Sequence, residues 1–353
     1  MHFITLDVFT DTPFLGNPLA VVIVEARERD GLDRARKQLI AREFNLSETA
    51  FLYLRPGETL QRPDRSSSAR ELGIFTTEQE LPFAGHPTIG TAYFLLRHLG
   101  WDFVDTIVPR AGPIRITKTT TDGGSGGGGV LASIPHDVHL HSRTLRSLLQ
   151  AQQQKKQQQQ QQGDDDSEGE EEEGIAARIQ ASLHDDSDIR DAELDAPAVS
   201  IVKGMAFVLV ELPSLGHLGR VRAGRRPGPP PASLLDEGPW ADGFVGRYYF
   251  VRGGGGGGGR RTEEAVRARL VAPSLEDPAT GSAASALASY LSLRGEADEV
   301  RYRVTQGVEM GRKSDIEVNV VSGAGGDGGR VIKEVRLGGT ATVVMKGEIQ
   351  VPA

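Results

Sequence analysis

The stretch LPFAGHPTIGTAYFLLRHLG, residues 81–100, decides the fold, because its pattern returns near the far end of the chain as EDPATGSAASALASYLSLRG, residues 276–295. Each copy contains a polar residue, Pro, two residues, Gly, one residue and Ala, followed by an apolar run. Proline is tolerated at the start of a helix, where its missing N–H would be unpaired anyway. We therefore expect a helix to begin at each copy, with His86 and Asp277 at the two N-caps.

These two helix starts predict an anion site. The first N–H groups of a helix have no helical partner and carry the positive end of the helix dipole. Two such starts facing each other would form an anion-binding cleft with an ionisable side chain on each wall. The first helix is apolar nearly all round and the second is rich in small residues, so each is predicted to lie inside a wrap of strands.

Length and composition limit the possible classes of protein. A chain of 353 residues predicts two domains. The net charge of −8 comes from residues 164–173, which hold eight acidic side chains, so neither nucleic acid nor an anionic membrane is an expected partner. The absence of cysteine excludes disulfides and thiol nucleophiles. With no basic leader and no run of 18 apolar residues, we expect a soluble cytoplasmic protein.

The domain boundaries follow from runs of low complexity. We expect an N-terminal domain over 1–119, with room for the C-terminal strand 341–353 to return to it, and a C-terminal domain over 130–340. Gly-, Gln-, Pro- or acid-rich tracts cannot bury enough apolar surface to offset their ordering entropy, so we interpret them as a hinge and flexible surface insertions. These tracts are 121–129, 150–174, 222–231, 253–259 and 323–329. A partner-binding role for them is the less favoured alternative.

Alternation and helical spacing predict the remaining elements of the first half. We expect strands over 3–9, 19–24, 48–54 and 70–76 and an amphipathic helix over 32–44. Three histidines, His136, His139 and His141, crowd together, but no carboxylate pattern nearby completes a ligand set. We therefore expect no metal site.

Five blocks, in order, resemble the PhzF family of phenazine-biosynthesis-like isomerases and epimerases. They are LDVFTDTPFLGNPLAVV, FNLSETAFL, ELPFAGHPTIGTA, EDPATGSAASALASYL and QGVEMGRKSDIEV. The resemblance implies an α+β fold similar to diaminopimelate epimerase. That fold has two pseudo-symmetric domains, each a strongly curved, barrel-like and mostly antiparallel sheet around a central helix, with the active site between them. A homodimer is expected on the same ground.

The resemblance also implies roles for individual residues. It makes Glu48 the proton donor and acceptor and places His86 and Asp277 beside it as catalytic residues. The predicted substrate-binding residues are Asn17, Ser47, Gly85, Pro87, Gly281, Ser282, Gln306 and Arg312. Simpler readings of the residues remain open: Asp277 as a plain N-cap, Glu48 as a solvated charge, and Arg312 as a surface ion pair. Asn17 is equally well a turn former.

The predicted chemistry is general acid–base catalysis without a cofactor. A carboxylate can move a proton near neutral pH if burial and a bound anion raise its pKa. Diaminopimelate epimerase and proline racemase use paired cysteines in the corresponding cleft, so the lack of cysteine excludes their two-thiol route here. We expect an isomerase or epimerase acting on a small carboxylate-bearing metabolite. The opposing hypothesis is a non-catalytic small-molecule-binding or protein-interaction module on the same fold.

Overall fold

The computed structural model describes residues 1–119, 128–162, 169–221, 230–253, 262–271, 276–326 and 328–352, apart from the side chains of 159–162 and 169–173. Most of the predicted hinge and most of the tracts 222–231 and 253–259 lie outside these residues. No helix in the described ranges has the length and apolar character needed to cross a membrane.

The first half of the chain forms eight strands around one helix. The strands are β1 (His2–Val8), β2 (Asn17–Val24), β3 (Thr49–Tyr53), β4 (Ala69–Phe75), β5 (Glu80–Leu81), β6 (Thr106–Val108), β7 (Ile114–Lys118) and β8 (Val130–Ser133). The central helix α2 (Gly85–Tyr93) continues into a π-turn over Phe94–His98, and α1 (Arg34–Phe44) lies outside the sheet with a short 3-10 turn at Ala26–Glu28. The predicted strands and the predicted amphipathic helix of this half are confirmed within a few residues.

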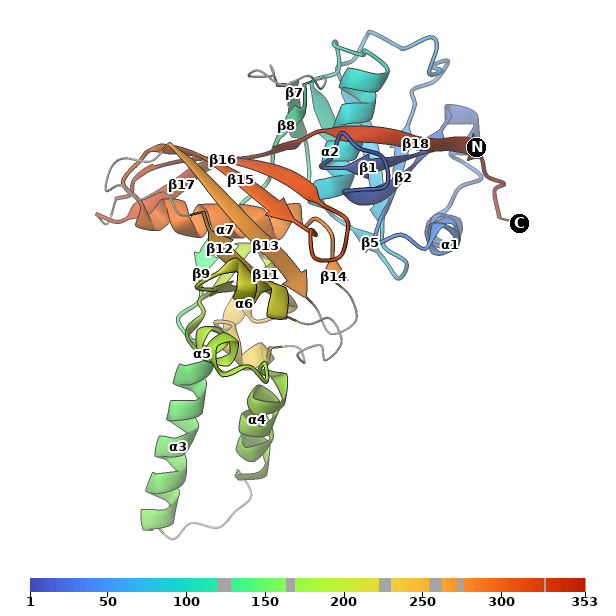
Figure 1. The fold of residues 1–353 in the computed structure, drawn as a ribbon. Coiled ribbons are helices and arrows are strands. Elements are labelled where there is room, and N and C mark those ends of the chain that lie inside the picture. The colour runs from blue at the N-terminus through green and yellow to red at the C-terminus, as the bar shows by residue number, and fades with distance from the viewer. Residues whose placement is uncertain are drawn as a thin grey trace.

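The second half repeats this plan around α7 (Gly281–Arg294). Its strands are β10 (Ala198–Val202), β11 (Gly204–Glu211), β12 (Gly243–Arg252), β13 (Glu263–Val271), β14 (Glu276–Asp277), β15 (Glu299–Gln306), β16 (Ser314–Ala324) and β17 (Arg330–Gly339). In both halves the second and third strands pair in parallel, as do the fourth and sixth, while the other pairs are antiparallel. Figure 1 shows the two curved sheets, each holding its helix on the inside. The predicted α+β architecture is confirmed.

The two halves are joined where their last strands meet. β8 pairs with β7 on one side and with β17 on the other. Ala132 and Leu337 occupy matching positions in the two repeats, since Ala132 pairs with Ile116 on β7 and Leu337 pairs with Val318 on β16. These two residues also pair with each other, so an approximate two-fold axis runs through this ladder. The C-terminal strand β18 (Ala341–Glu348) then crosses to pair with β1.

Both central helices are enclosed, as their composition predicts. Residues 85–92 of α2 are buried on every side, and α7 buries the small residues that follow Gly281. A single apolar cluster includes side chains from both helices and from the strands of both halves. The large apolar faces that neither helix could expose to water are thereby removed from solvent.

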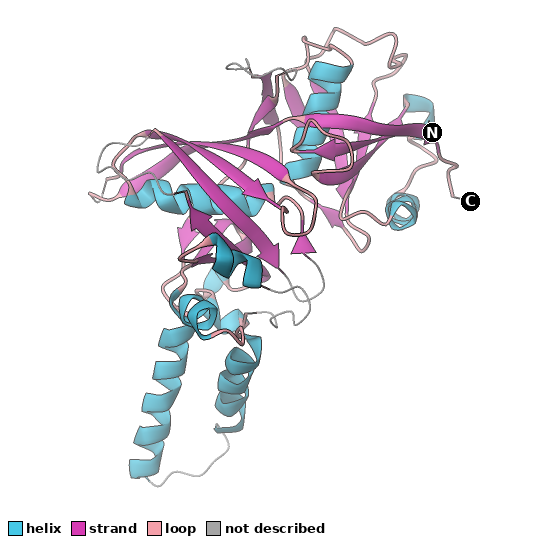
Figure 2. Cartoon of the chain, in the orientation of Figure 1, coloured by secondary structure: helices cyan, strands magenta, loops and turns pink. Residues whose placement is uncertain are grey.

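The glutamine-rich tract corrects the prediction of a flexible loop at 150–174. Residues up to Gln162 belong to α3 (Leu145–Gln162), and α4 (Gly169–Ser182) follows, with α5 (Ser187–Asp195) at their base. Glutamine, lysine and glutamate are good helix formers, a property that an argument from low hydrophobicity overlooks. Figure 2 shows α3 and α4 side by side, extending away from the two sheets. Their base is anchored by apolar side chains including Leu145, Ile179 and Leu183, which pack on the second half.

The remaining elements are short connections in the second half. They are β9 (His139–Leu140), α6 (Leu215–Arg220) and the 3-10 turns Ala232–Leu234 and Gly238–Trp240. β16 and β17 pair as an antiparallel hairpin on either side of the Gly-rich tract at 323–329.

Candidate active site

The starts of α2 and α7 touch each other. A Cβ atom placed on Gly85 would lie 3.4 Å from the Cα atom of Gly281, and a Cβ atom on either glycine would come within 3.0 Å of a methyl carbon of Leu337, so the two glycines let both helix starts pack against this side chain. Neither N-cap residue, Ala84 or Thr280, accepts a hydrogen bond from its helix through a side chain. The two helix starts thus lie close together without side-chain caps, so the positive ends of two helix dipoles are near each other.

The structure corrects the alignment of the two helix starts. His86 is the second residue of α2 rather than its N-cap, and Asp277 lies on β14, three residues before the N-cap of α7. The residues that match in space are Pro82 and Pro278, each followed by the glycine that opens its helix. The simple capping reading of Asp277 is wrong, since Thr280 holds that position.

Glu48 and His86 form the first wall of this region. Glu48 directly precedes β3, and its Oε2 atom lies 3.5 Å from Nδ1 of His86. The Glu48 side chain is 19% exposed and that of His86 5%. Burial raises the pKa of Glu48, against a smaller opposing effect of the Ser47 hydroxyl. The Glu48 carboxylate is thus largely shielded from bulk solvent.

His86 is held in its neutral form. Burial lowers its pKa to about 4, although the charge of Asp277 and the carbonyl of Pro18 act in the opposite direction. Its Nε2 atom is buried without a hydrogen-bond partner among the described residues. A neutral imidazole with one unused nitrogen can donate or accept a hydrogen bond to a bound molecule.

Asp277 forms the opposite wall, on β14 of the second half. Its Oδ1 atom accepts from Nδ2 of Asn17 at 2.9 Å, and its Oδ2 atom accepts from the hydroxyl of Thr280 at 2.6 Å. Burial and the nearby charge of Glu48 raise the pKa of Asp277 to about 6, against the hydroxyl of Thr280 and the positive charge that His86 can carry. Asp277 therefore interacts electrostatically with both residues of the first wall.

A buried amide fixes the turn that carries Asp277. Gln306 donates from Nε2 to the backbone carbonyl of Asp277 at 2.8 Å and to the Thr280 hydroxyl at 3.0 Å. Its Oε1 atom accepts from the hydroxyl of Tyr248 at 2.9 Å and from the N–H of Thr280 at 3.2 Å. The donors and acceptors of Gln306 are thus used inside the protein, where they hold the turn that carries Asp277.

Asn17 and Arg312 join the two halves near this site. Besides Asp277, Asn17 donates to the carbonyl of Ala279 at 2.9 Å. Arg312 donates to Oδ1 of Asp7 at 2.7 Å and to the carbonyls of Gly16 and Leu15. The loop before Asn17 is thereby tied to the second half, and the guanidinium of Arg312 is committed to protein groups.

The other predicted site residues fall into two groups. Gly85, Pro87 and Gly281 are buried in the first turns of the two central helices. Ser282 is half-buried in the first turn of α7, and Ser47 is exposed beside Glu48.

Sequence reasoning missed Tyr248 and Thr280 as parts of the site. Thr280 lies within the quoted EDPATGS block and could have been found there. Tyr248 lies in an aromatic strand with no motif around it, and only the fold brings it to Gln306.

Comparisons with known proteins identify the family. The model of the family described as phenazine biosynthesis-like protein matches residues 6–213 and 258–347. An uncharacterized isomerase of Mesorhizobium japonicum is 29% identical over 357 residues, covering 99% of this chain and 98% of that protein. The trans-2,3-dihydro-3-hydroxyanthranilate isomerase of Pseudomonas chlororaphis is 41% identical over 97 residues, 28% of this chain and 30% of that enzyme.

A solved structure extends the likeness to the whole fold. The crystal structure of a PhzF family protein from Bacillus anthracis is similar with a TM-score of 0.64, covering 99% of both chains. Its sequence identity is 18%, so the likeness concerns the fold alone.

Proposed function

We propose that this chain, which belongs to the phenazine biosynthesis-like family and is an isomerase, moves a proton on a small carboxylate-bearing metabolite by general acid–base catalysis between its two halves. Glu48 is the proposed acid and base. The observation that carries the proposal is the 3.5 Å approach of the Glu48 carboxylate to the neutral His86 imidazole, beside two helix starts that touch.

The helix starts would bind the carboxylate of the substrate. Their N–H groups and dipoles favour an anion, and they stabilise most strongly the charge that develops on that carboxylate when the neighbouring carbon loses its proton. A substrate carboxylate next to Glu48 would raise the pKa of Glu48 further by like-charge repulsion, towards the pH at which the enzyme works.

Proton transfer then needs no group outside the chain. The ionised Glu48 takes a proton from the carbon next to the substrate carboxylate, and the electron pair left behind is delocalised into that carboxylate. The now protonated Glu48 returns the proton to another carbon of a conjugated system, which gives double-bond isomerisation. Return of a proton to the original carbon gives epimerisation only when that proton reaches the opposite face of the carbon. General acid–base transfer of this kind contributes roughly 100- to 10,000-fold in rate.

His86 and Asp277 would orient the substrate. The buried Nε2 atom of His86 offers a hydrogen bond, and Asp277 can hold a cationic or hydroxyl group from the opposite side. The name of the Pseudomonas chlororaphis relative gives a dihydro-hydroxyanthranilate as its substrate, which carries a carboxylate. We take that class of compound, together with amino and hydroxy acids, as the first set to screen.

The test follows solvent deuterium into substrate and product in heavy water. The wild-type protein is expected to incorporate deuterium, and Glu48→Gln is expected to lower that rate by roughly 100- to 10,000-fold while the protein still folds and binds. Glu78→Gln, an exposed carboxylate in the turn before β5, is the matched control and should exchange at the wild-type rate. Undiminished exchange in Glu48→Gln would remove Glu48 from this role.

The expected homodimer is a separate part of the proposal, since it follows from family resemblance. A sedimentation mass of two chains supports it, and a mass of one chain at working concentration would contradict it.

A further inference from the structure

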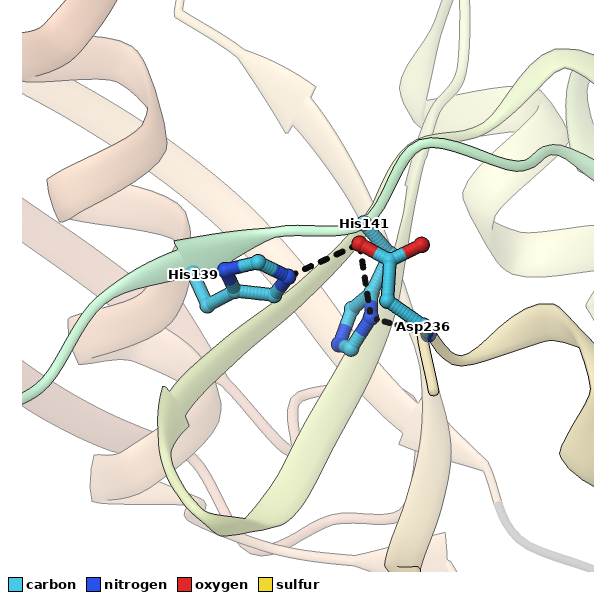
Figure 3. A group of neighbouring side chains, drawn as sticks. All are labelled: His139, His141 and Asp236. Carbon is cyan, nitrogen blue, oxygen red and sulfur yellow. Dashed lines mark hydrogen bonds and ion pairs between the residues drawn. The ribbon is translucent and has the colours of Figure 1, made fainter. Parts of the chain in front are cut away.

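Two histidines and an aspartate meet at the edge of the second sheet. His139 lies on β9 and His141 follows two residues later, so both side chains leave the strand on the same face. Asp236 comes from the connection between two 3-10 turns, more than ninety residues further along the chain. Figure 3 shows the carboxylate of Asp236 directed to both imidazole rings. The carboxylate that the sequence did not provide near His139 and His141 is therefore supplied by the fold.

The distances in this cluster resemble those of a metal-ligand set. Oδ2 of Asp236 lies 2.8 Å from Nε2 of His139 and 3.9 Å from Nδ1 of His141, and the three candidate ligand atoms lie within 4.8 Å of one another. Ligand atoms around tetrahedral Zn²⁺ are bonded at about 2.0–2.1 Å and are thus about 3.4 Å apart. The separation between His139 and Asp236 is below that value, that between His141 and Asp236 is about 0.5 Å above it, and the longest in the cluster is up to about 1.4 Å above it. Side-chain rotations that shift the ligand atoms by up to about an ångström would therefore bring them into place.

The surrounding hydrogen bonds orient the candidate ligands. The hydroxyl of Ser200 lies 2.9 Å from Nε2 of His141, and Nδ1 of His141 accepts from the backbone N–H of Asp236 at 3.0 Å. His141 therefore carries its proton on Nε2 and turns the lone pair of Nδ1 towards Asp236. The second carboxylate oxygen, Oδ1, accepts from the hydroxyl of Ser142 at 2.7 Å, and the backbone N–H of Ser142 donates to Oδ1 at 3.2 Å and to Oδ2 at 3.3 Å, so Ser142 fixes the carboxylate while Oδ2 faces the two imidazoles. Metal-binding histidines and carboxylates are usually fixed by outer contacts of this kind.

An aromatic ring fixes the third ligand. The ring of His139 stacks on Trp240 with 4.5 Å between centroids and 9° between planes. This contact restrains the rotation of the imidazole while its Nε2 atom stays directed to Asp236. All three side chains are thus held in place before any ion arrives, which lowers the ordering cost of binding.

We propose that His139, His141 and Asp236 form a binding site for a divalent transition-metal ion that accepts nitrogen and oxygen ligands, with Zn²⁺ as the probe. The ion replaces two contacts: the hydrogen bond between His139 and Asp236, and the one that the Asp236 N–H donates to His141. The Nε2 proton of His139 passes to solvent, and the ring keeps or takes a proton on Nδ1. Three protein ligands leave a fourth position for water.

Such an ion would join the edge strand β9 to the segment around Asp236. Those parts of the chain already touch through the side chains described above, and metal bonds would hold them more firmly than these hydrogen bonds. The cluster has no residue in common with Glu48, His86 or Asp277, so its role is separate from the proposed proton transfer.

The test is calorimetric titration of the chelator-treated full chain with Zn²⁺. The wild-type protein is expected to bind one equivalent, and Asp236→Asn and His139→Ala are each expected to weaken binding by at least about tenfold. His136→Ala removes a neighbouring histidine outside the cluster and should bind as the wild type does. Binding by Asp236→Asn or His139→Ala with wild-type affinity, or loss of binding in His136→Ala, would overturn the proposal.

Two further measurements distinguish loss of the metal site from loss of the folded structure. Co²⁺ bound by histidine and carboxylate gives visible absorption bands, which should be present for the wild type and for His136→Ala and absent for Asp236→Asn. Zn²⁺ should also raise the melting temperature of the wild type and His136→Ala but not of His139→Ala, because only an ion bound to the native state stabilises it. Equal shifts in all three proteins would contradict a site at these residues.

Discussion

The strand that carries Glu48 and its counterpart in the second half occupy the same place in their sheets, yet the second half has Gly246 where the first has Glu48. Thr49 pairs with Phe75 on the neighbouring strand as Arg247 pairs with Val271, and Phe75 and Val271 pair in turn with Glu80 and Glu276. The residue before Thr49 therefore matches the residue before Arg247. A position that holds an ionisable group in one half holds no side chain in the other.

The same comparison runs through the rest of the site. The partner of Ile74 on β5 is Leu81, and the partner of Leu270 on β14 is Asp277, so an apolar residue in the first half matches a carboxylate in the second. His86, the second residue of α2, matches Ser282, the second residue of α7.

The difference teaches how a duplicated framework becomes asymmetric. Backbone ladders, helix starts and the Gly85–Gly281 contact are common to both halves, because they position the site. The ionisable side chains are divided: Glu48 and His86 come from the first half and Asp277 from the second. Within the proposed mechanism, the first half moves the proton and the second half holds the substrate.

The first test of this comparison replaces each of the two matching residues, Leu81 and Asp277, by asparagine. Asp277→Asn is expected to lower kcat/KM by roughly 10- to 150-fold, because a hydrogen bond to a charged group contributes about 1.5–3 kcal/mol. Leu81→Asn places the same side chain at the matching position of the first half. It should leave the kcat/KM of the folded protein close to that of wild type.

Steady-state kinetics on the substrate found by exchange screening would measure both variants. Equal losses of kcat/KM in Asp277→Asn and Leu81→Asn would show that activity depends on the place of the residue in the sheet and not on the carboxylate of Asp277. The assignment of substrate holding to the second half would then fail.

The second test uses the pKa shifts of Asp277 and His86, which have opposite signs. The pKa of Asp277 is raised to about 6 from 3.8, so the folded protein binds this proton more tightly than the unfolded chain and loses stability as the pH rises from about 4 to 6. The pKa of His86 is lowered to about 4 from 6.5, so the folded protein binds that proton more weakly and gains stability over about the same range. Each shift is expected to contribute about 2 kcal/mol, with the two signs opposed.

Single substitutions should reveal how Asp277 and His86 each change the dependence of the free energy of unfolding on pH. Relative to wild type, the free energy of unfolding of Asp277→Asn should rise by about 2 kcal/mol between pH 4 and 6, and that of His86→Asn should fall by a similar amount. Glu48, whose raised pKa acts in the same sense as that of Asp277, is present in all three proteins. Urea unfolding at several pH values measures the curves. Slopes of the same sign in both variants would contradict the assigned shifts.

The sequence was enough to predict what local patterns determine. The two helix starts, the first strands and the residues Glu48, His86 and Asp277 all lie in short blocks that can be read directly. The alignment of the blocks was not fixed, because the first copy contains Pro-x-x-Gly twice, at Pro82 and at Pro87. Only the ladder between β4 and β5 shows that Pro82 is the match to Pro278.

Long-range partners could not be predicted. Asn17, Gln306 and Arg312 were expected to hold substrate, but their polar atoms bind groups of the protein itself. Asn17 binds Asp277, 260 residues further along the chain, and Arg312 binds Asp7, 305 residues before it. Such contacts leave no trace in residue spacing. For the same reason Asp236 could not be assigned to His139 and His141 from the sequence.

The last way to sharpen the comparison concerns what the second half has and the first lacks: the hairpin of α3 and α4. Leu148, Leu149 and Ile175 pack at its base, and no described residue of 150–174 belongs to that apolar cluster. Replacing 150–174 by a short Gly/Ser linker should therefore change the free energy of unfolding by less than about 0.5 kcal/mol and leave turnover unchanged.

A matched change at the base should behave differently. Ile179 is fully buried against the second half, so Ile179→Ala should cost about 2–5 kcal/mol in stability. If the deletion instead abolished turnover, the hairpin would be part of the enzyme, and the division of the site between two repeated halves would be incomplete. If it kept turnover but removed the biological effect of the protein, the opposing hypothesis of an interaction module would gain the hairpin as its contact surface. Unchanged turnover with unchanged effect would leave proton transfer between the halves as the function of the chain.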